Sequence, residues 1–252
     1  MVEIAICLAI IGFALVAIIG VLPIGMNTQR DNREETIINQ DATVFIEAIR
    51  NGAHGLDDLA NYVYAITNYW TFYNATTGNT NVGVNGYIYN NYSIAPQYYT
   101  KFGSPIYNGT NIIGLLSTPE YTDNSGNPIN NLFNGGYSNH VVAWVRSISG
   151  PAVEKPPQNN QIIQGDSFGY RILCVNAPVA LAENTTLYST NLNANLHELR
   201  LTFLWPQLAN GGVGSSRQTF RTLIAGQLAQ TTNNAAAMPL YFYQSQSFTN
   251  AP

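Results

Sequence analysis

The feature that most constrains this chain is a run of apolar residues from Ile4 to Leu22 that carries no charge. As an α-helix these 19 residues would extend ~30 Å, which approaches the thickness of the hydrocarbon core of a membrane. A cleaved secretory signal has a basic front, a shorter apolar stretch and a small-residue cleavage site. Here an acid, Glu3, stands in front of the run and a proline, Pro23, follows it. The pattern therefore favours a membrane anchor, or an anchor that later packs in an assembly, over a cleaved signal.

A second apolar pattern continues directly from this run. Apolar residues recur at spacings of three and four with polar residues between them, which is typical of an amphipathic helix. We predict one helix from Met1 to Asn51 that ends at the sequence NGAHG, where Gly52 and Gly55 supply C-cap chemistry. Its first half is apolar all round, and its second half has one apolar face. That face consists of Ile37, Ile38, Ala42, Phe45, Ile49 and Ala53, of which we expect Ile38, Phe45 and Ile49 to pack on the chain's own domain.

The segment VEIAICLAIIGFALVAIIGVLPIGMNTQ resembles the N-terminal segment of type IV pilins and of the pseudopilins of type II secretion. The features in common are an early acid, a long apolar stretch with glycines, a proline and an amphipathic continuation. The Leu22-Pro23 pair is closest in look to bacterial minor pseudopilins. The resemblance covers about the first fifth of the chain. It implies an α+β, pilin-like fold, in which a long helix over 1–52 protrudes with its apolar half and packs with its amphipathic half on an antiparallel sheet. A β-rich domain with a C-terminal tail would then occupy 53–252.

The same resemblance implies a structural subunit of a helical filament, either a pilus or a secretion pseudopilus. Its partners would be copies of itself or related pilins, the inner membrane before assembly, and the pilus or secretion assembly machinery. It would be a single-pass inner-membrane precursor first and part of an extracellular or periplasmic filament later. Glu3 would pair with a neighbour's terminal ammonium, and Pro23 would soften the helix. The remaining assembly residues would be Ile4, Leu8, Ile11, Phe13, Leu15, Ile18 and Leu22.

The start of the chain departs from the family pattern. Pilin precursors carry a short basic leader that a dedicated peptidase removes before it methylates the new N-terminus. The sequence printed here shows no such leader before Met1, and Glu3 stands about two residues nearer to the start than the family's glutamate does. We expect the printed start either to be an internal methionine or to be an unusual mature start, and we assign no methylation to Met1.

Two other interpretations stay open. One is a minor subunit at the filament tip that initiates assembly or binds a secreted substrate or a surface ligand. The other is a single-pass membrane protein whose β-domain binds a ligand and never polymerises. A plain anchor does not explain how the β-domain is exported. The nearest cations, Arg30 and Arg33, follow the apolar run, and the positive-inside rule would keep them, and the domain after them, in the cytoplasm.

The rest of the chain reads as mainly β-structure. Alternating or β-branched segments predict strands over 140–148, 168–175, 196–206 and 217–228, with a loose hairpin at 207–216 between the last two. Asn85-Gly86 predicts a two-residue hairpin turn. We also predict a short helix in 56–70, with Leu56, Leu59, Ala60 and Val63 on one face. The segment 150–161 would be a surface loop, and 231–252 would be a partly ordered tail.

Composition narrows the possible functions. Charged residues make up 10% of the chain and the net charge is -4, which argues against nucleic-acid binding, since such domains display a basic stripe. Cys7 and Cys174 lie in unrelated segments, so we expect no disulfide between them. Tyrosine is dense in 61–74 and 87–102; we favour aromatic packing there over ligand binding.

We find no pattern typical of catalysis. No histidine has a second ligand at metal-binding spacing, and the sequence HELR lacks the second histidine of a zinc-protease helix. Nor does any serine have a paired histidine and acid that would predict a triad. We therefore expect neither an enzyme nor a cofactor. The sequence TDNSGNP offers oxygen ligands of the kind that calcium prefers, without the EF-hand spacing. Its weak candidate ligands are Asp123, Asn124 and Asn127.

Overall fold

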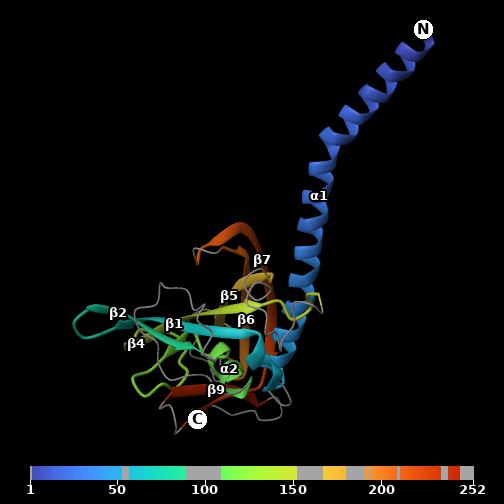
Figure 1. The fold of residues 1–252 in the computed structure, drawn as a ribbon. Helices are drawn as coiled ribbons and strands as arrows, with labels where there is room; N and C mark the ends of the chain where they lie inside the picture. Colours follow the sequence, from blue (N-terminus) through green and yellow to red (C-terminus); the bar gives the residue numbers. More distant parts are fainter. Residues whose placement is uncertain are drawn as a thin grey trace. The chain divides into compact units, whose positions relative to one another are not determined.

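The computed structural model describes residues 2–52, 57–88, 109–151, 167–179, 191–192, 194–208, 211–233 and 238–244. One long helix and an antiparallel sheet make this an α+β chain (Figure 1). It divides into two compact units, Met1–Gln40 and Asp41–Pro252. The division falls inside the helix, so the last turns of the helix belong to the β-rich unit.

The N-terminal helix predicted from the apolar and amphipathic patterns is confirmed as α1, Val2–Arg50. It continues through Pro23, whose nitrogen has no proton to donate to the carbonyl four residues earlier. The helix ends as predicted at Gly52, which has a φ of 66°, a conformation that glycine adopts without strain. Gly55, the other predicted capping residue, and Ala53 lie outside the described residues.

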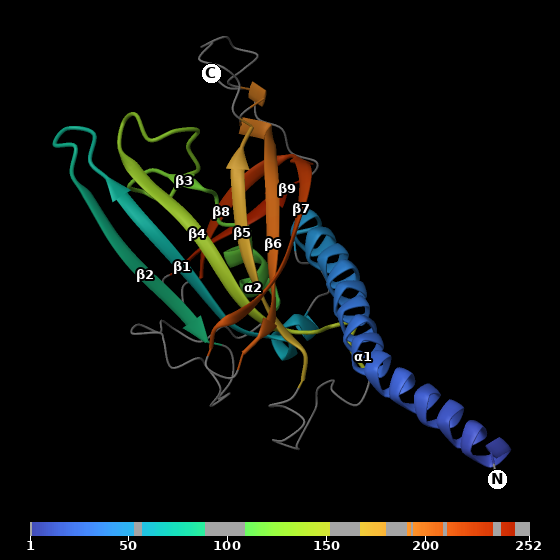
Figure 2. The ribbon, with the colours of Figure 1, turned by 90° about the horizontal axis from the view of Figure 1, so that it is seen from above.

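A single antiparallel sheet carries most of the second unit. Its strand order is β2-β1-β4-β5-β6-β7, and the short strand β3 pairs with β4. Figure 2 shows these strands side by side with a pronounced twist. The strands are β1 Val63–Tyr73, β2 Thr80–Ile88, β3 Tyr121–Thr122, β4 Gly136–Arg146, β5 Gly169–Pro178, β6 Leu196–Gln207 and β7 Val213–Ala225.

A helix and a hairpin cover one face of this sheet. Helix α2, Gly109–Leu116, contacts β1 and β4 on one side and β9 on the other. Strands β8, Gln227–Asn233, and β9, Met238–Gln244, form a separate two-stranded sheet. The close approach of α2 to β9 needs Gly114, because a Cβ there would lie 2.8 Å from the Cβ of Leu240. The three layers enclose a core in which the largest buried side chains include Trp144, Tyr170, Phe203, Tyr241 and Ile112.

The four predicted strands are all present, as β4, β5, β6 and the β7–β8 region. In β6 the burial alternates residue by residue, as the sequence pattern predicts. The segment predicted as one strand over 217–228 is divided at Gly226, where φ is 127° and β7 gives way to β8. The predicted loose hairpin between β6 and β7 is confirmed by their antiparallel pairing and by the bond from the Leu208 N–H to the Gly212 carbonyl.

The helix predicted within 56–70 is wrong. Only a short 3₁₀ turn, η1, forms at Asp57–Asn61, and β1 begins at Val63. The β-branched and aromatic residues from Val63 onward favour an extended chain, and pairing with two neighbouring strands outweighs the helical spacing. Leu59, Ala60 and Val63 are nevertheless buried, and Leu56 lies outside the described residues.

The turn predicted at Asn85-Gly86 is also wrong. Strand β2 passes straight through these residues, which pair with Asn68 and Thr67 of β1. The chain turns instead at 74–79, where the side-chain oxygen of Asn74 accepts bonds from the N–H groups of Thr76 and Thr77. This Asx-type turn satisfies its own backbone, and the long β1 partner holds Asn85-Gly86 extended.

Part of the predicted tail is ordered structure. Residues 231–233 complete β8 and 238–244 form β9, whose Leu240, Tyr241 and Tyr243 are buried. Alternation of apolar residues in a short segment rich in Gln and Thr was too weak a signal to identify this hairpin. The other residues of the predicted tail, and most of the predicted loop at 150–161, lie outside the described residues.

A buried carboxylate fixes the last turns of α1 within the second unit. The side chain of Asp41 is fully buried. It accepts bonds from the Tyr170 hydroxyl at 2.7 Å and from the N–H groups of Ile148 and Ser149 at 2.9 and 2.8 Å. Burial, together with the neighbouring carboxylate, raises the pKa of Tyr170 well above its ordinary value. Asp41 thus ties α1 to β5 and to the segment that follows β4.

We predict that Asp41→Asn lowers the free energy of unfolding of this unit by about 1–3 kcal/mol, because the amide nitrogen would face a backbone donor and leave it unsatisfied. Urea unfolding followed by tryptophan fluorescence measures this, since Trp70, Trp144 and Trp205 all lie in the second unit. Asp31→Asn, at an exposed position, is the matched control. Equal stability of the two variants would contradict the anchoring role.

Candidate functional site

The first unit presents an apolar surface that nothing in the described chain covers. Every residue from Val2 to Arg33 is exposed, including Ile4 at 66%, Leu8 at 65% and Phe13 at 80%. This is the one helix among the described residues that is long and apolar enough to cross a membrane. Membrane anchors and signal sequences both have this property.

The continuous helix brings most of the predicted assembly residues onto one face. Ile4, Leu8, Ile11, Leu15, Ile18 and Leu22 follow one another at alternating spacings of four and three. At about 100° per residue such positions form a narrow stripe, the spacing of a helix that packs lengthwise on other helices. Phe13 lies on the opposite side of the helix. The apolar surface therefore surrounds the whole helix.

Glu3 and Pro23 lie at the two ends of this apolar surface. Glu3 is exposed in the first turn of α1, where a carboxylate also interacts favourably with the helix dipole. Pro23 lies inside the helix, one residue after Leu22. The predicted packing residues Ile38, Phe45 and Ile49 are all buried.

The weak calcium candidates Asp123, Asn124 and Asn127 share one turn after β3. The Asp123 carboxylate accepts bonds from the N–H groups of Ser125 and Asn127, both at 2.8 Å, and from the Asn127 side chain at 3.0 Å. Burial is the largest single influence and opposes ionisation, but the hydrogen bonds together outweigh it and lower the pKa of Asp123. The carboxylate therefore organises its own turn, and calcium binding stays a prediction. No group of three or more metal-binding side chains is found in the described ranges.

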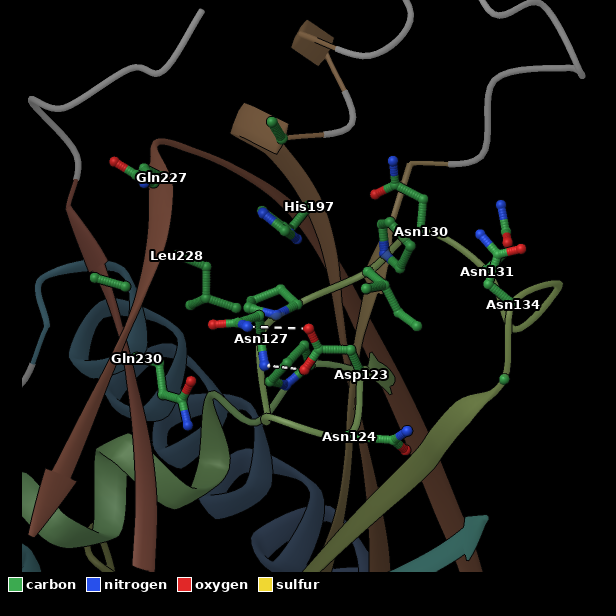
Figure 3. A pocket seen from close by; sticks show the side chains of 17 residues that line it. Asp123, Asn124, Asn127, Asn130, Asn131, Asn134, His197, Gln227, Leu228 and Gln230 are labelled. Carbon is green, nitrogen blue, oxygen red and sulfur yellow. Dashed lines mark hydrogen bonds between the residues drawn. The ribbon is translucent and has the colours of Figure 1, made fainter. Parts of the chain in front are cut away.

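This turn forms part of the wall of a hollow in the second unit. The hollow measures about 970 Å³ and lies between the β3–β4 connection, β6 and β8. Figure 3 shows His197 projecting from β6 between this connection and the β8 side chains. Amide side chains dominate the wall, and Asp123 is the single ionised residue among the described residues that line it.

His197 is the most unusual side chain of this hollow. It is only 4% exposed, and neither ring nitrogen makes a hydrogen bond of good geometry with the described residues. Burial lowers its pKa to about 4, and a weaker hydrogen-bonding contact with the backbone of Ala194 opposes this shift. Its ring packs edge-on against Tyr243. The imidazole is therefore neutral at pH 7.

Sequence reasoning missed this hollow. Its described lining residues come from four separated segments, within 119–135, at 178, within 194–197 and within 227–230, and none of them forms a recognised motif. The abundance of asparagine around Asp123 was the one local signal. For His197 the sequence correctly placed the residue on the buried face of β6, but it did not indicate that both ring nitrogens would lack partners.

No protein-family model, no curated protein and no solved structure matches this chain. Arguments about its function therefore rest on the residues themselves.

We predict that His197 makes the second unit less stable in mild acid. Above pH 6.5 the imidazole is neutral in both states; between pH 6.5 and 4 the unfolded chain binds a proton that the folded chain does not. The contribution of His197 should thus lower the free energy of unfolding by roughly 2–3 kcal/mol between pH 7.5 and 4.5.

His197→Gln should remove that part of the pH dependence, measured by urea unfolding at both pH values. His140→Gln, which replaces an exposed histidine of β4, should keep it. A pH dependence in His197→Gln as steep as in the original chain would exclude His197 as its source.

Proposed function

We propose that the chain is a structural subunit of a helical filament of the type IV pilin kind. The observation that carries this proposal is the bare apolar helix. Residues 2–33 are exposed without exception, and the apolar residues among them surround the helix. The helix then continues without a break into the β-rich unit.

An apolar surface of this size does not stay in water. Exposed apolar patches on soluble monomers rarely exceed a few hundred Å², and burial contributes about 25 cal/mol per Å². Covering a rod of about 20 apolar residues is therefore favourable by tens of kcal/mol before ordering costs are subtracted. Lipid covers such a helix before assembly, and the equivalent helices of other subunits cover it afterwards. The stripe from Ile4 to Leu22 suits the second environment, because its spacing allows lengthwise packing of helices.

Glu3 can fix the position of one helix along its neighbours, which a uniform apolar surface cannot do. An apolar rod can slide along its neighbours at little cost, whereas one carboxylate among them has few favourable positions. Moving a charged side chain to the bilayer centre costs about 2.5–3.5 kcal/mol on insertion scales. Pairing with a neighbouring subunit's terminal ammonium recovers energy at one alignment only. Subunits added head to tail in this way form an open, helical assembly.

We predict that Glu3→Lys abolishes filaments and that Glu3→Gln reduces them at least several-fold, while both variants remain in the membrane fraction. Electron microscopy and mass spectrometry of sheared surface material measure filament yield. Glu35→Lys, a charge reversal at an exposed position of the same helix, should leave the yield unchanged.

The same experiment separates the alternatives. A single-pass anchor that never polymerises would show no filaments in any variant and full membrane retention. A minor tip subunit would appear in the sheared filaments at a small fraction of the major component, and its Glu3→Lys variant would reduce the number of filaments. Normal assembly of Glu3→Lys would overturn the registration role.

We predict that Pro23→Ala stiffens the helix. Alanine would restore the missing hydrogen bond to the carbonyl of Ile19, and alanine is the best helix former. Filaments of this variant should bend less in electron micrographs and should assemble at an altered rate. Val21→Ala, which changes a neighbouring apolar residue without adding a hydrogen bond, is the control. Unchanged bending and assembly in Pro23→Ala would contradict the role of Pro23 as a soft point.

A further inference from the structure

We propose that the β-rich unit binds a neutral oligosaccharide in a cleft lined by amide side chains. The cleft consists of the hollow beside His197 and a second hollow of about 440 Å³. The two share Asp123, Asn124 and Gln230 in their walls, so they lie next to each other. Their volumes lie within or near the range of about 300–1,000 Å³ that is typical of small-molecule sites.

The wall of the first hollow offers many neutral hydrogen-bonding groups. Gln227 and Gln230 come from β8, while the β3–β4 connection supplies a series of asparagines (Figure 3). An amide presents donors and an acceptor together, as the hydroxyl groups of a sugar do. The asparagines are Asn124, Asn127, Asn130, Asn131 and Asn134.

The second hollow combines amides with an aromatic platform. Trp70 of β1 and Tyr137 of β4 both line it, with ring centroids 5.5 Å apart in an edge-to-face arrangement. The indole lies across Gly83 of β2, where any larger side chain would overlap the ring. Asn68 and Asn139 lie beside these rings and are joined by a hydrogen bond of 3.0 Å. A pyranose ring presents apolar C–H faces beside hydroxyl groups. The aromatic rings of this wall can pack on the C–H faces, and its amides can form hydrogen bonds with the hydroxyl groups.

Two buried polar groups in the cleft lack hydrogen bonds of good geometry, which points to a ligand. The His197 side chain is almost fully buried and lines the first hollow, yet its ring has only a weak contact with the backbone of Ala194. The side-chain oxygen of Asn68 is unpaired in the second hollow. Buried polar groups are rarely left unsatisfied, because each loses the hydrogen bonds that it made with water in the unfolded chain. A neutral imidazole has one donor and one acceptor, and a hydroxyl group can satisfy either.

The charge of the cleft selects against other ligands. Among the described lining residues there is no Lys, Arg or Glu, and Asp123 is already bonded within its own turn. A phosphate or a carboxylate would thus meet no cation and one anion. Amides are the most numerous polar groups of both walls, so a peptide with charged side chains would also find no partner of opposite charge except Asp123. A neutral polyhydroxylated chain is the class that fits these walls best.

The test is isothermal titration calorimetry of the full chain in lauryldimethylamine oxide micelles, because detergents with sugar headgroups would compete. The probes are maltohexaose, cellohexaose, mannohexaose, xylohexaose and chitohexaose, with hexagalacturonate and hexaglycine for comparison. At least one neutral hexasaccharide should bind at least tenfold more tightly than hexagalacturonate and hexaglycine. Binding of none of them would overturn the proposal, as would equal or tighter binding of hexaglycine, which would indicate a peptide site.

Variants test whether the oligosaccharide binds in the cleft. Asn124→Ala combined with Gln230→Ala should weaken it about tenfold, since each neutral hydrogen bond is worth a few-fold in affinity. Asn81→Ala, an exposed amide of β2 outside the cleft, should not change it. If the double variant is unstable by thermal unfolding, Asn124→Ala alone serves, because Asn124 is exposed. Equal affinity of the cleft variant and the control would place the binding elsewhere and overturn the proposal.

Discussion

The β-rich unit depends on one buried carboxylate. Asp41 lies where α1 enters this unit, and it binds two backbone N–H groups after β4 and the hydroxyl of Tyr170 on β5. A buried carboxylate is tolerated only where donors surround it, so this group specifies one position of the helix on the sheet. Apolar contacts of Phe45 and Ile49 alone would permit small shifts along the helix axis. The carboxylate does not permit them.

The constraint on the first unit is an exposed apolar surface rather than a buried polar group. Its residues from Val2 to Arg33 are all exposed, so nothing in the described chain covers the apolar part of the helix. In the filament that we propose, lipid and the helices of other subunits are both apolar, and either would cover most of this surface at similar energy. On this proposal Glu3, at the start of the helix, would be the group whose energy differs most between the two environments.

Much of the fold could be predicted from local patterns. The helix over 2–50 follows from an unbroken apolar run and an amphipathic continuation, and β6 follows from strict alternation. The failures have a common cause, which is competition from long-range pairing. The helical spacing of Leu56, Leu59, Ala60 and Val63 leads into residues 63–70, which gain two strand partners instead. Asn85-Gly86 is held extended by β1, and the weak alternation of β9 is stabilised by its contact with α2. The hollow beside His197 could not be predicted, because its walls come from segments up to about 100 residues apart.

The sequence by itself determined the long helix, its uncharged surface, the position of Glu3 and Pro23, and the α+β class, because each of these is a property of neighbouring residues. Only the tertiary structure decided which polar groups would be buried together. It placed Asp41 among three donors, left His197 with no hydrogen bond of good geometry and gathered amides from several separate segments around one cleft. Hydrogen bonds form at about 3 Å, and no local pattern records which distant donors and acceptors the folded sheet will bring to that distance.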